Sequence, residues 1–329
     1  MRFSLCTNQY NHISELNLTV SSRDEQTIIE DVYFTAPLKI TKPFFKNNWL
    51  LIMLISVSAG LMSGDAQLLN LHIKKDSQAE LTSQSYEKIH YMNEGFAHRK
   101  TNIQIDKNAC FLYHPLPILP FKNSNLKNEV TVHLKDETSR FAYSEVLACG
   151  RAARNEIFAY TKYQSLSKIF MQDKLIYLDN SIYIPSQINM SGFLMYEKYT
   201  HLLNFIYIGN VDEGIFPFVY DIFNNSIDIN GGISKIENGI CIKILSTNSE
   251  NLLKVENLIL NYIKNHYIIK KCANYKVSAF FYFTYKIYLY INLHSFYTYL
   301  LDKMLMNIQM EYHFDYMQPL LYIIMEHFP

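Results

Sequence analysis

The feature that most constrains this chain is a repeat with a period of 30 residues. Three stretches align without a gap at that period: LHIKKDSQAELTSQS from Leu71, TNIQIDKNACFLYHP from Thr101 and TVHLKDETSRFAYSE from Thr131. Each copy alternates apolar and polar residues, breaks at a polar turn centred on an aspartate, and alternates again. This pattern predicts two half-buried strands joined tightly. The aligned columns hold Asp76, Asp106 and Asp136, then Ala79, Ala109 and Ser139, and then Leu81, Phe111 and Phe141.

A fixed period of this length constrains the architecture, because one such pair of strands cannot bury its apolar face alone and needs a neighbour on each side. We therefore expect an all-β fold with two helices, built as an elongated stack of β-sheets that resembles a β-solenoid or β-helix. The alternative is an ordinary β-sandwich whose hairpins happen to be evenly spaced.

Two segments carry helical patterns. Residues 248–265 place apolar residues at helical spacing behind a capping box formed by Thr247 and Glu250. A shorter candidate covers residues 212–225, where Pro217 fits only near the first turn. The alternation in KLIYLDNSIYI and LLNFIYI, between Tyr160 and Ile208, predicts further strands.

The chain divides by composition into three parts. We expect an N-terminal segment over residues 1–27, a β domain with both helices over residues 28–267, and an atypical tail over residues 268–329. The tail is crowded with aromatic and aliphatic residues and shows no clean period. Lys286 and His294 interrupt its most apolar part, which disfavours a membrane span. We expect it to be poorly ordered.

Charge and cysteine content exclude several classes of partner. Thirty basic residues balance thirty acidic ones, and no basic stripe interleaved with aromatic residues is present, so we expect no nucleic-acid partner. The amino end lacks the apolar core of a signal peptide, and we expect a cytoplasmic protein that binds no membrane. The cysteines are too far apart for a zinc site and are typical of reduced thiols. They are Cys6, Cys110, Cys149, Cys241 and Cys272.

Five stretches, in this order, closely resemble one known family. They are YFTAPLKITKPFF (33–45), SVSAGLMSGDA (56–66), LTSQSYEKIH (81–90), FLYHPLPILPF (111–121) and SEVLACGRAARNEIF (144–158). Together they are similar to the urease accessory proteins called UreD in most bacteria and UreH in Helicobacter. The likeness covers about residues 28–263. It departs at Ala59, where the family usually has proline, and the tail after Tyr275 has no counterpart.

The resemblance implies a urease maturation chaperone that is not an enzyme. Such proteins bind a helical partner called UreF and, through it, the nickel-carrying GTPase UreG. The resemblance also implies that the assembly docks on apo-urease and delivers Ni²⁺ through an internal channel lined by carboxylates. This chain has no GxxxxGK[ST] phosphate loop, so GTP chemistry would belong to UreG. We expect no tightly bound cofactor and only transient contact with Ni²⁺.

The resemblance also places functional weight on particular residues. They are Asp65, Gln84, Lys88, His90, Glu145, Arg151 and Glu156, with Gly60, Gly64 and Gly150 as structural glycines. The two glycines of SAGLMSGDA would let the chain turn twice and present Asp65 to the interior. A carboxylate binds a divalent cation weakly enough to release it, so Asp65, Glu145 and Glu156 are candidates for passing nickel along.

Each of these residues also has a purely structural interpretation. Asp65 could cap the backbone of its own turn. Lys88, Arg151 and Arg154 could neutralise Glu145 and Glu156 in a buried ionic network that needs no metal. His90 and His98 could be ordinary imidazoles, since no HxH or HxxxH pair supports a tight site.

A second functional class stays open on the residues alone. A carbohydrate-active β-solenoid enzyme could use Asp65, Glu145 or Glu156 as acid and base, with Arg151 or Lys88 stabilising the negative charge that develops. Exposed aromatic residues along a groove would favour the enzyme. An enclosed interior with carboxylates, together with an apolar face for a helix, would favour the scaffold.

Overall fold

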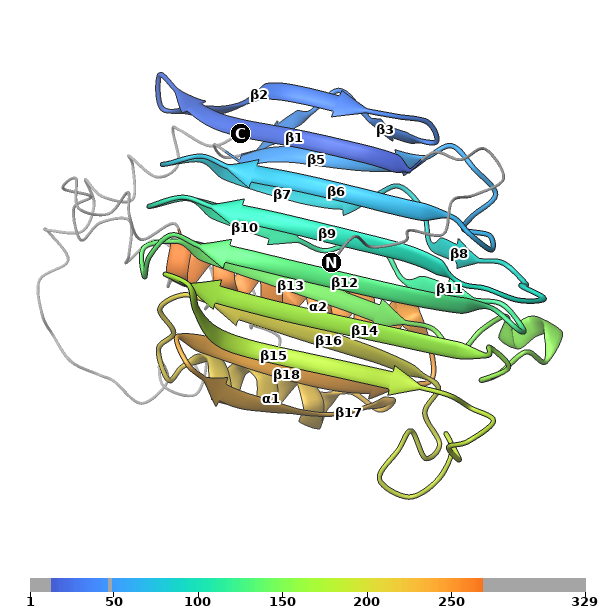
Figure 1. Ribbon diagram of the computed structural model, residues 1–329. Coiled ribbons are helices and arrows are strands. Elements are labelled where there is room, and N and C mark those ends of the chain that lie inside the picture. The colour runs from blue at the N-terminus through green and yellow to red at the C-terminus, as the bar shows by residue number, and fades with distance from the viewer. Residues whose placement is uncertain (1–12, 47–48, 269–329) are drawn as a thin grey trace, which may run out of the picture. The chain divides into compact units, whose positions relative to one another are not determined.

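Two β-sheets face each other and enclose the main apolar core (Figure 1). The computed structural model describes residues 13–46 and 49–268, so the expectations for the tail beyond residue 268 lie outside the described residues. In spatial order, the seven-stranded sheet comprises β15 (Lys174–Tyr183), β14 (Lys162–Met171), β12 (Asn125–Leu134), β9 (Ala97–Ile105), β6 (Ala66–Ile73), β1 (Ser14–Arg23) and β2 (Gln26–Phe34).

The second sheet has eleven strands and forms the other layer. Its order is β17 (Ile229–Ile236), β18 (Gly239–Ser246), β16 (His201–Ile208), β13 (Arg140–Leu147), β10 (Cys110–Tyr113), β7 (Gln78–Ser83), β5 (Trp49–Ser56) and β3 (Leu38–Ile40). Three short strands complete this sheet: β4 (Phe44–Lys46) pairs with β5, and β11 (Ile118–Pro120) pairs with β13 and with β8 (Glu87–Ile89).

The 30-residue repeat builds the middle of both sheets. Each copy sends its first strand into the seven-stranded sheet and its second into the eleven-stranded sheet: β6 with β7, β9 with β10, and β12 with β13. Equivalent strands of successive copies then pair in parallel. The turns follow the same rule, because the backbone N–H of Asp76 donates to the carbonyl of Lys107 in the next copy. Each unit therefore satisfies backbone hydrogen bonds of its strands and its turn by pairing with the neighbouring unit.

The pairing register shifts the first copy by two residues from the sequence alignment. Ala79, and not Leu81, pairs with Phe111, which in turn pairs with Phe141. In the turns, Asp76 and Asn108 both adopt left-handed backbone conformations, which Asp and Asn tolerate better than most residues. The turn conformation, rather than the column of aspartates, sets the register.

The expectation of a solenoid-like stack is only partly met. The fold is mostly β with two helices, but both sheets are mixed and form neither a solenoid nor a closed barrel within the described residues. Antiparallel strands flank the parallel centre at β2, β15 and β16 to β18. The strand β1 already lies inside the seven-stranded sheet, so sheet formation begins ahead of residue 28, where we placed the start of the β domain.

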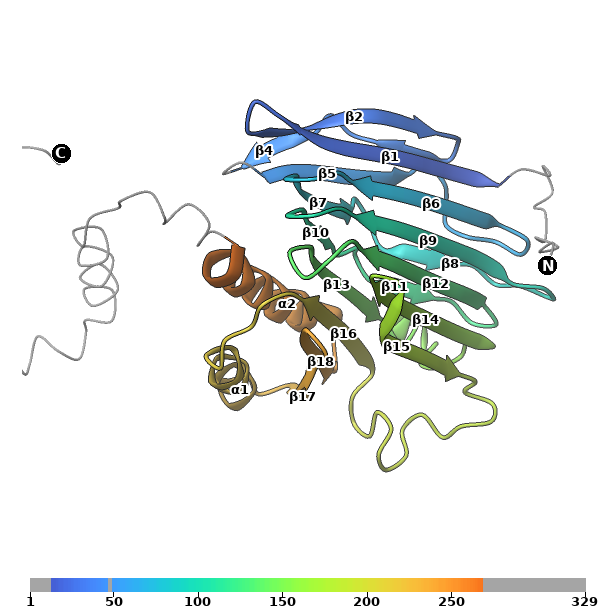
Figure 2. The same ribbon diagram turned by 60° about the vertical axis from the view of Figure 1, so that its left-hand side comes forward.

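Both helices cover the outer face of the eleven-stranded sheet (Figure 2). The helix α1 spans Ile215–Asn225, with Pro217 in its first turn, and α2 spans Ser249–Ile263, followed by a short π-helical turn, Lys264–Ile268. The side chain of Asn248 caps α2 by accepting from the backbone N–H of Asn251 at 2.9 Å. The cap is therefore Asn248, where the sequence pattern had placed Thr247.

Candidate functional site

A row of polar side chains crosses the otherwise apolar space between the two sheets. We call it the interior polar row; it comprises Gln67 (β6), Glu87 (β8), Arg99 (β9), Asn128 (β12), Glu145 (β13) and Ser165 (β14). Along β9 the inward positions run from Ala97 through Arg99 to Ile103, because successive side chains of a strand point to opposite faces. The row separates the main apolar cluster from a smaller one.

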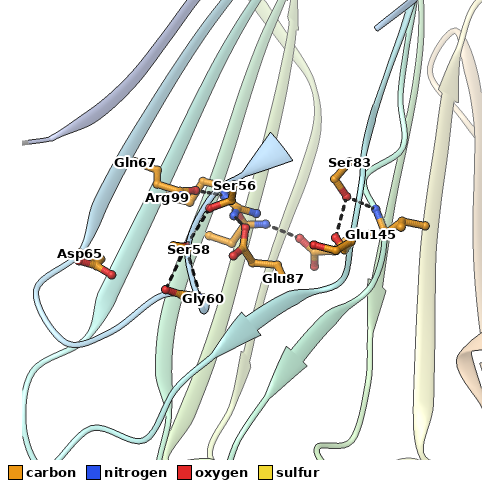
Figure 3. Close-up of polar contacts among 12 residues, drawn as sticks. Ser56, Ser58, Gly60, Asp65, Gln67, Ser83, Glu87, Arg99 and Glu145 are labelled. Carbon is orange, nitrogen blue, oxygen red and sulfur yellow. Dashed lines mark hydrogen bonds and ion pairs between the residues drawn. The ribbon is translucent and has the colours of Figure 1, made fainter. Parts of the chain in front are cut away.

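Arg99 is the cation of the interior polar row and is only 7% exposed. Its guanidinium donates to the Glu87 carboxylate through Nη2, and to Gln67 Oε1 through Nε at 2.8 Å. Burial by itself would lower the pKa of Arg99, but the adjacent Glu87 carboxylate outweighs this and raises it. The buried Arg99 and the half-buried Glu87 therefore form a charge-compensated pair contributed by the two opposing sheets (Figure 3).

Glu145 is the second carboxylate of the row and is 3% exposed. Its Oε2 accepts from Asn128 Nδ2 at 2.6 Å, Tyr143 OH at 2.9 Å and Ser165 Oγ at 3.0 Å. All three donors are neutral, so these contacts satisfy hydrogen bonding without cancelling the charge. Burial, followed by the Glu145 charge, raises the pKa of Tyr143 well above its usual range, so Tyr143 stays a donor.

Some polar atoms of the row have no protein partner within the described part of the chain. Gln67 Nε2 and Asn128 Oδ1 are both buried in this way. An unpaired buried polar atom is costly unless water or another polar species reaches it. The row therefore has spare hydrogen-bonding capacity beside its two carboxylates.

The Gly-Asp stretch lies at the edge of this region and not inside it. Gly60 and Gly64 both have positive φ angles. The half-buried Asp65 accepts from the backbone N–H of Met62 through Oδ2 at 2.7 Å. This is the contact that a turn-capping aspartate makes. In Figure 3, Asp65 stands apart from Arg99 and Glu87.

Other predicted residues gather around the ring of Phe121 in what we call the rim cluster. Arg151 stacks on Phe121 with 4.0 Å between the guanidinium carbon and the ring centroid. It also donates to both oxygens of Glu156, at 2.7 Å and 2.5 Å. His90 packs edge-on against the same ring, and its Nε2 lies 2.9 Å from the carbonyl oxygen of Ala59. Gly150 has positive φ and sits against the Glu156 carbonyl.

The structure thus distributes the predicted residues over separate places. His90, Arg151 and Glu156 meet in the rim cluster, whereas Glu145 lies in the interior polar row. Gln84 and Lys88 are exposed. Arg151 compensates Glu156 as the ionic interpretation expects, but the hydrogen-bond partners of Glu145 are the neutral side chains given above.

Sequence reasoning missed Gln67, Glu87, Arg99 and Asn128. The signal was available for Arg99, since AHRKTNIQI alternates and puts an arginine in phase with Ala97, Ile103 and Ile105. A charged residue at an inward strand position is rare unless it is paired. Its partner Glu87 lies on a three-residue strand with too little pattern to assign a face.

Comparison with known proteins decides the family. The family described as UreD urease accessory protein matches residues 12–277. The chain belongs to the UreD urease accessory protein family. It is 41% identical to UreH of Helicobacter hepaticus over 229 residues, covering 70% of this chain and 89% of that protein. It is 37% identical to UreH of Helicobacter pylori strain J99 over 255 residues, covering 77% of this chain and 95% of that protein.

The likeness extends beyond Helicobacter. The chain is 31% identical to UreD of Acetivibrio thermocellus over 258 residues, covering 77% of this chain and 98% of that protein. UreD/UreH proteins are accessory scaffolds and not enzymes, so this chain has an accessory role in urease maturation. The alternative of a carbohydrate-active enzyme is therefore wrong.

No group of three or more His, Cys, Asp or Glu side chains among the described residues is arranged to hold a metal ion. Across the same residues, no helix combines the length and apolar character needed to cross a bilayer.

Proposed function

We propose that this chain is a cytoplasmic scaffold for inserting nickel into urease. It binds a helical partner of the UreF type and, through it, a UreG-type GTPase, and the assembly docks on apo-urease. Ni²⁺ is the cargo and is held only transiently. The UreD family assignment supports the role in maturation. The chemistry of the interior polar row supports a route for Ni²⁺ through the space between the two sheets.

The observation that carries this proposal is the charge balance of the interior polar row. Arg99 compensates Glu87, whereas the hydrogen bonds to Glu145 come from neutral donors. Coulombic attraction is strong in a buried environment because the effective dielectric constant is low. The carboxylate of Glu145, whose hydrogen-bond partners among the described residues are all neutral, is therefore the attractive point for a divalent cation that enters between the sheets.

The donor set also favours release. A site with one carboxylate and neutral oxygens binds a transition-metal ion more weakly than a site of several histidines or thiolates. Asp65 and Glu156 lie outside the interior polar row, where they would act as first or last contacts. Asp65 is held by its own turn and Glu156 by Arg151, so both carboxylates have fixed positions.

Amide substitutions test the path. Glu145→Gln keeps the size of the side chain, and its carbonyl can still accept from Asn128 and Ser165, but the charge is lost. Expressed with UreF, UreG and the urease subunits, Glu145→Gln should lower nickel-dependent urease activation at least tenfold while the variant still co-purifies with UreF. Asp65→Asn and Glu156→Gln should show smaller losses.

Glu256→Gln is the matched control. Glu256 is equally buried, at 2% exposed, but lies on the helix side of the eleven-stranded sheet, where Ser144 donates to it. This variant should activate urease normally. Full activation by all three variants of the proposed path would leave the chain as a docking platform without a conduit. A wild-type chain that does not support activation at all would contradict the role in maturation.

A further inference from the structure

The interior polar row lies at one level of the seven-stranded sheet. In the pairing register, Arg99 on β9 is opposite Gln67 on β6 and Asn128 on β12, and Asn128 is opposite Ser165 on β14. Residues paired across neighbouring strands point to the same face of a sheet, so these four side chains form one continuous line. Arg99 stands in this line between Gln67 and Asn128.

The facing sheet brings two carboxylates to this line. Glu87 accepts from Arg99, and Glu145 accepts from Asn128, the cross-strand neighbour of Arg99. Figure 3 shows Arg99, Glu87 and Glu145 in the same space between the sheets. Their three charges also act on the pKa of the buried Tyr113. Burial raises this pKa, the Arg99 guanidinium lowers it, and the two carboxylates raise it. The interior polar row therefore holds two carboxylates and one guanidinium within electrostatic reach of each other.

Stability alone does not explain an ion pair at this place. Along β9, Arg99 lies between Ala97 and Thr101, which are both fully buried. Replacing a buried ion pair by apolar residues of similar volume is often neutral or stabilising, so such a pair is weak evidence for a stabilising role. The guanidinium also stays protonated at physiological pH. The row therefore contains a permanent cation in the space that the proposed function assigns to a cation in transit.

A permanent cation at this place has two effects on a divalent ion. It occupies the Glu87 carboxylate, which would otherwise offer anionic oxygen ligands in addition to those of Glu145. It also repels a divalent ion near Glu145, and such Coulombic repulsion is strong where the effective dielectric constant is low. The affinity of an oxygen-ligand site for a divalent ion rises with the number of charged ligands. Without the guanidinium, the row would bind Ni²⁺ more tightly and release it more slowly.

We infer that Arg99 is a positioning residue that sets how tightly the interior holds Ni²⁺, because it keeps Glu87 from joining Glu145 as a ligand of the cargo. This inference rests on the proposed function. Arg99 acts through Glu87 and does not itself bind the ion. Its removal should therefore strengthen Ni²⁺ binding, whereas removal of a merely structural residue would weaken binding or leave it unchanged.

An ion pair at the β15 edge provides a matched control. Lys243 on β18 donates to Asp179 Oδ2 on β15 at 2.7 Å, so this pair also joins the two sheets. It lies at the level of the row, because Lys243 is opposite Asn204 and Asn204 is opposite Glu145. The Lys243 side chain is 49% exposed, however, whereas Arg99 is buried. Water and salt screen an exposed charge, so Lys243→Gln should leave Ni²⁺ binding unchanged.

The test measures Ni²⁺ binding to the full chain purified in complex with UreF, by competition with a chromophoric chelator. The contribution of UreF is then the same for every variant. Arg99→Gln frees the Glu87 carboxylate and should raise the affinity about tenfold or more, while urease activation falls because release slows. Arg99→Lys keeps the positive charge and should bind Ni²⁺ as the wild type does. Arg99→Gln combined with Glu87→Gln removes both charges and should return the affinity to within about threefold of the wild-type value.

A second arm uses the other member of the pair. Glu87→Gln leaves the guanidinium without its carboxylate beside Glu145, so urease activation should fall about tenfold or more. Adding Arg99→Gln to this variant should restore activation. Absence of both single variants from the complex with UreF would show that the pair serves folding, and would overturn the inference.

Unchanged Ni²⁺ affinity in a UreF-bound Arg99→Gln variant would also overturn the inference, and Glu145→Gln shows whether the proposed function fails with it. If Glu145→Gln still lowers urease activation, the path stands and only the role of Arg99 is lost. If Glu145→Gln activates urease fully, the path itself is contradicted. An equal gain in affinity in Arg99→Gln and Lys243→Gln would be a general effect of lost positive charge and would overturn the role of Arg99.

Discussion

At the scale of single residues, Gly60 shows how close backbone packing holds the Asp65 turn against the neighbouring strand. Its φ angle is 137°, and a Cβ atom built on it would lie 2.3 Å from the carbonyl oxygen of Lys88. That same carbonyl accepts from the backbone N–H of Leu61 at 2.8 Å. The stretch that carries Asp65 is thus pressed onto β8, the strand that supplies Glu87.

Gly60→Ala should therefore destabilise the chain by about 1–3 kcal/mol, because the new methyl group meets rigid backbone and the φ angle is strained. Gly232→Ala is the control. A Cβ atom at Gly232 meets nothing within 4 Å, and alanine in a strand loses less conformational entropy than glycine. Urea unfolding of the two variants measures the difference. Equal midpoints would show that the backbone near residue 60 can move aside freely.

At the scale of elements, a polar cluster joins the end of α2 to the eleven-stranded sheet. Glu80 on β7 lies 2.8 Å from His114 Nε2 and 2.5 Å from Lys264 Nζ, which directly follows α2. Burial by itself would raise the pKa of Glu80. The hydrogen bond and charge of His114, together with the charge of Lys264, outweigh burial and lower this pKa from 4.5 to about 2.

This shift predicts how the attachment of α2 depends on pH. Since the pKa of folded Glu80 lies below its unfolded value, the Glu80 contacts contribute stability above about pH 4.5 that is lost as the pH falls toward 2. Glu80→Gln should cost about 1–3 kcal/mol at pH 7, because it leaves the half-buried His114 and Lys264 without their charged acceptor. The difference from wild type, measured by urea unfolding, should shrink between pH 4.5 and 2. A difference that is constant with pH would contradict the assignment.

At the scale of the whole molecule, the parallel centre is the most protected part of the fold. The strands β9 and β12 have paired neighbours on both sides, and their inward side chains enter the main apolar cluster. The strands β2 and β17 are at the edges of their sheets and have a neighbour on one side only.

Amide hydrogen exchange of the isolated chain should follow this arrangement. The slowest amides should belong to β9 and β12, and those of β2 and β17 should exchange at least a hundredfold faster. An edge strand pairs on one side only, so its local opening breaks fewer contacts. Exchange should remain slower in β9 than in β2 throughout a urea titration below the midpoint. Uniform protection across all four strands would mean that the sheets open only as a single cooperative unit.

The sequence by itself determined that the fold consists mostly of β-strands with two helices. The period-2 alternation identified the strands of the repeat and those that became β15 and β16, and helical spacing identified α2, because both periods follow from local backbone geometry. The shorter helical candidate corresponds to α1. The 30-residue repeat correctly indicated stacked units. The alternation could not say whether the two strands of a unit pair with each other or with the next unit, since both arrangements bury the same side chains.

Only the tertiary structure decided that pairing and the contents of the interior. It placed the strands of each unit in opposite sheets. It also brought Glu87 and Glu145, from two other strands, into one row with Arg99. It also showed Asp65 accepting from the backbone of its own turn, one of the two roles that the sequence had left open for this residue. A pattern along one strand defines which face a side chain occupies, but the charge facing it comes from another strand and depends on register.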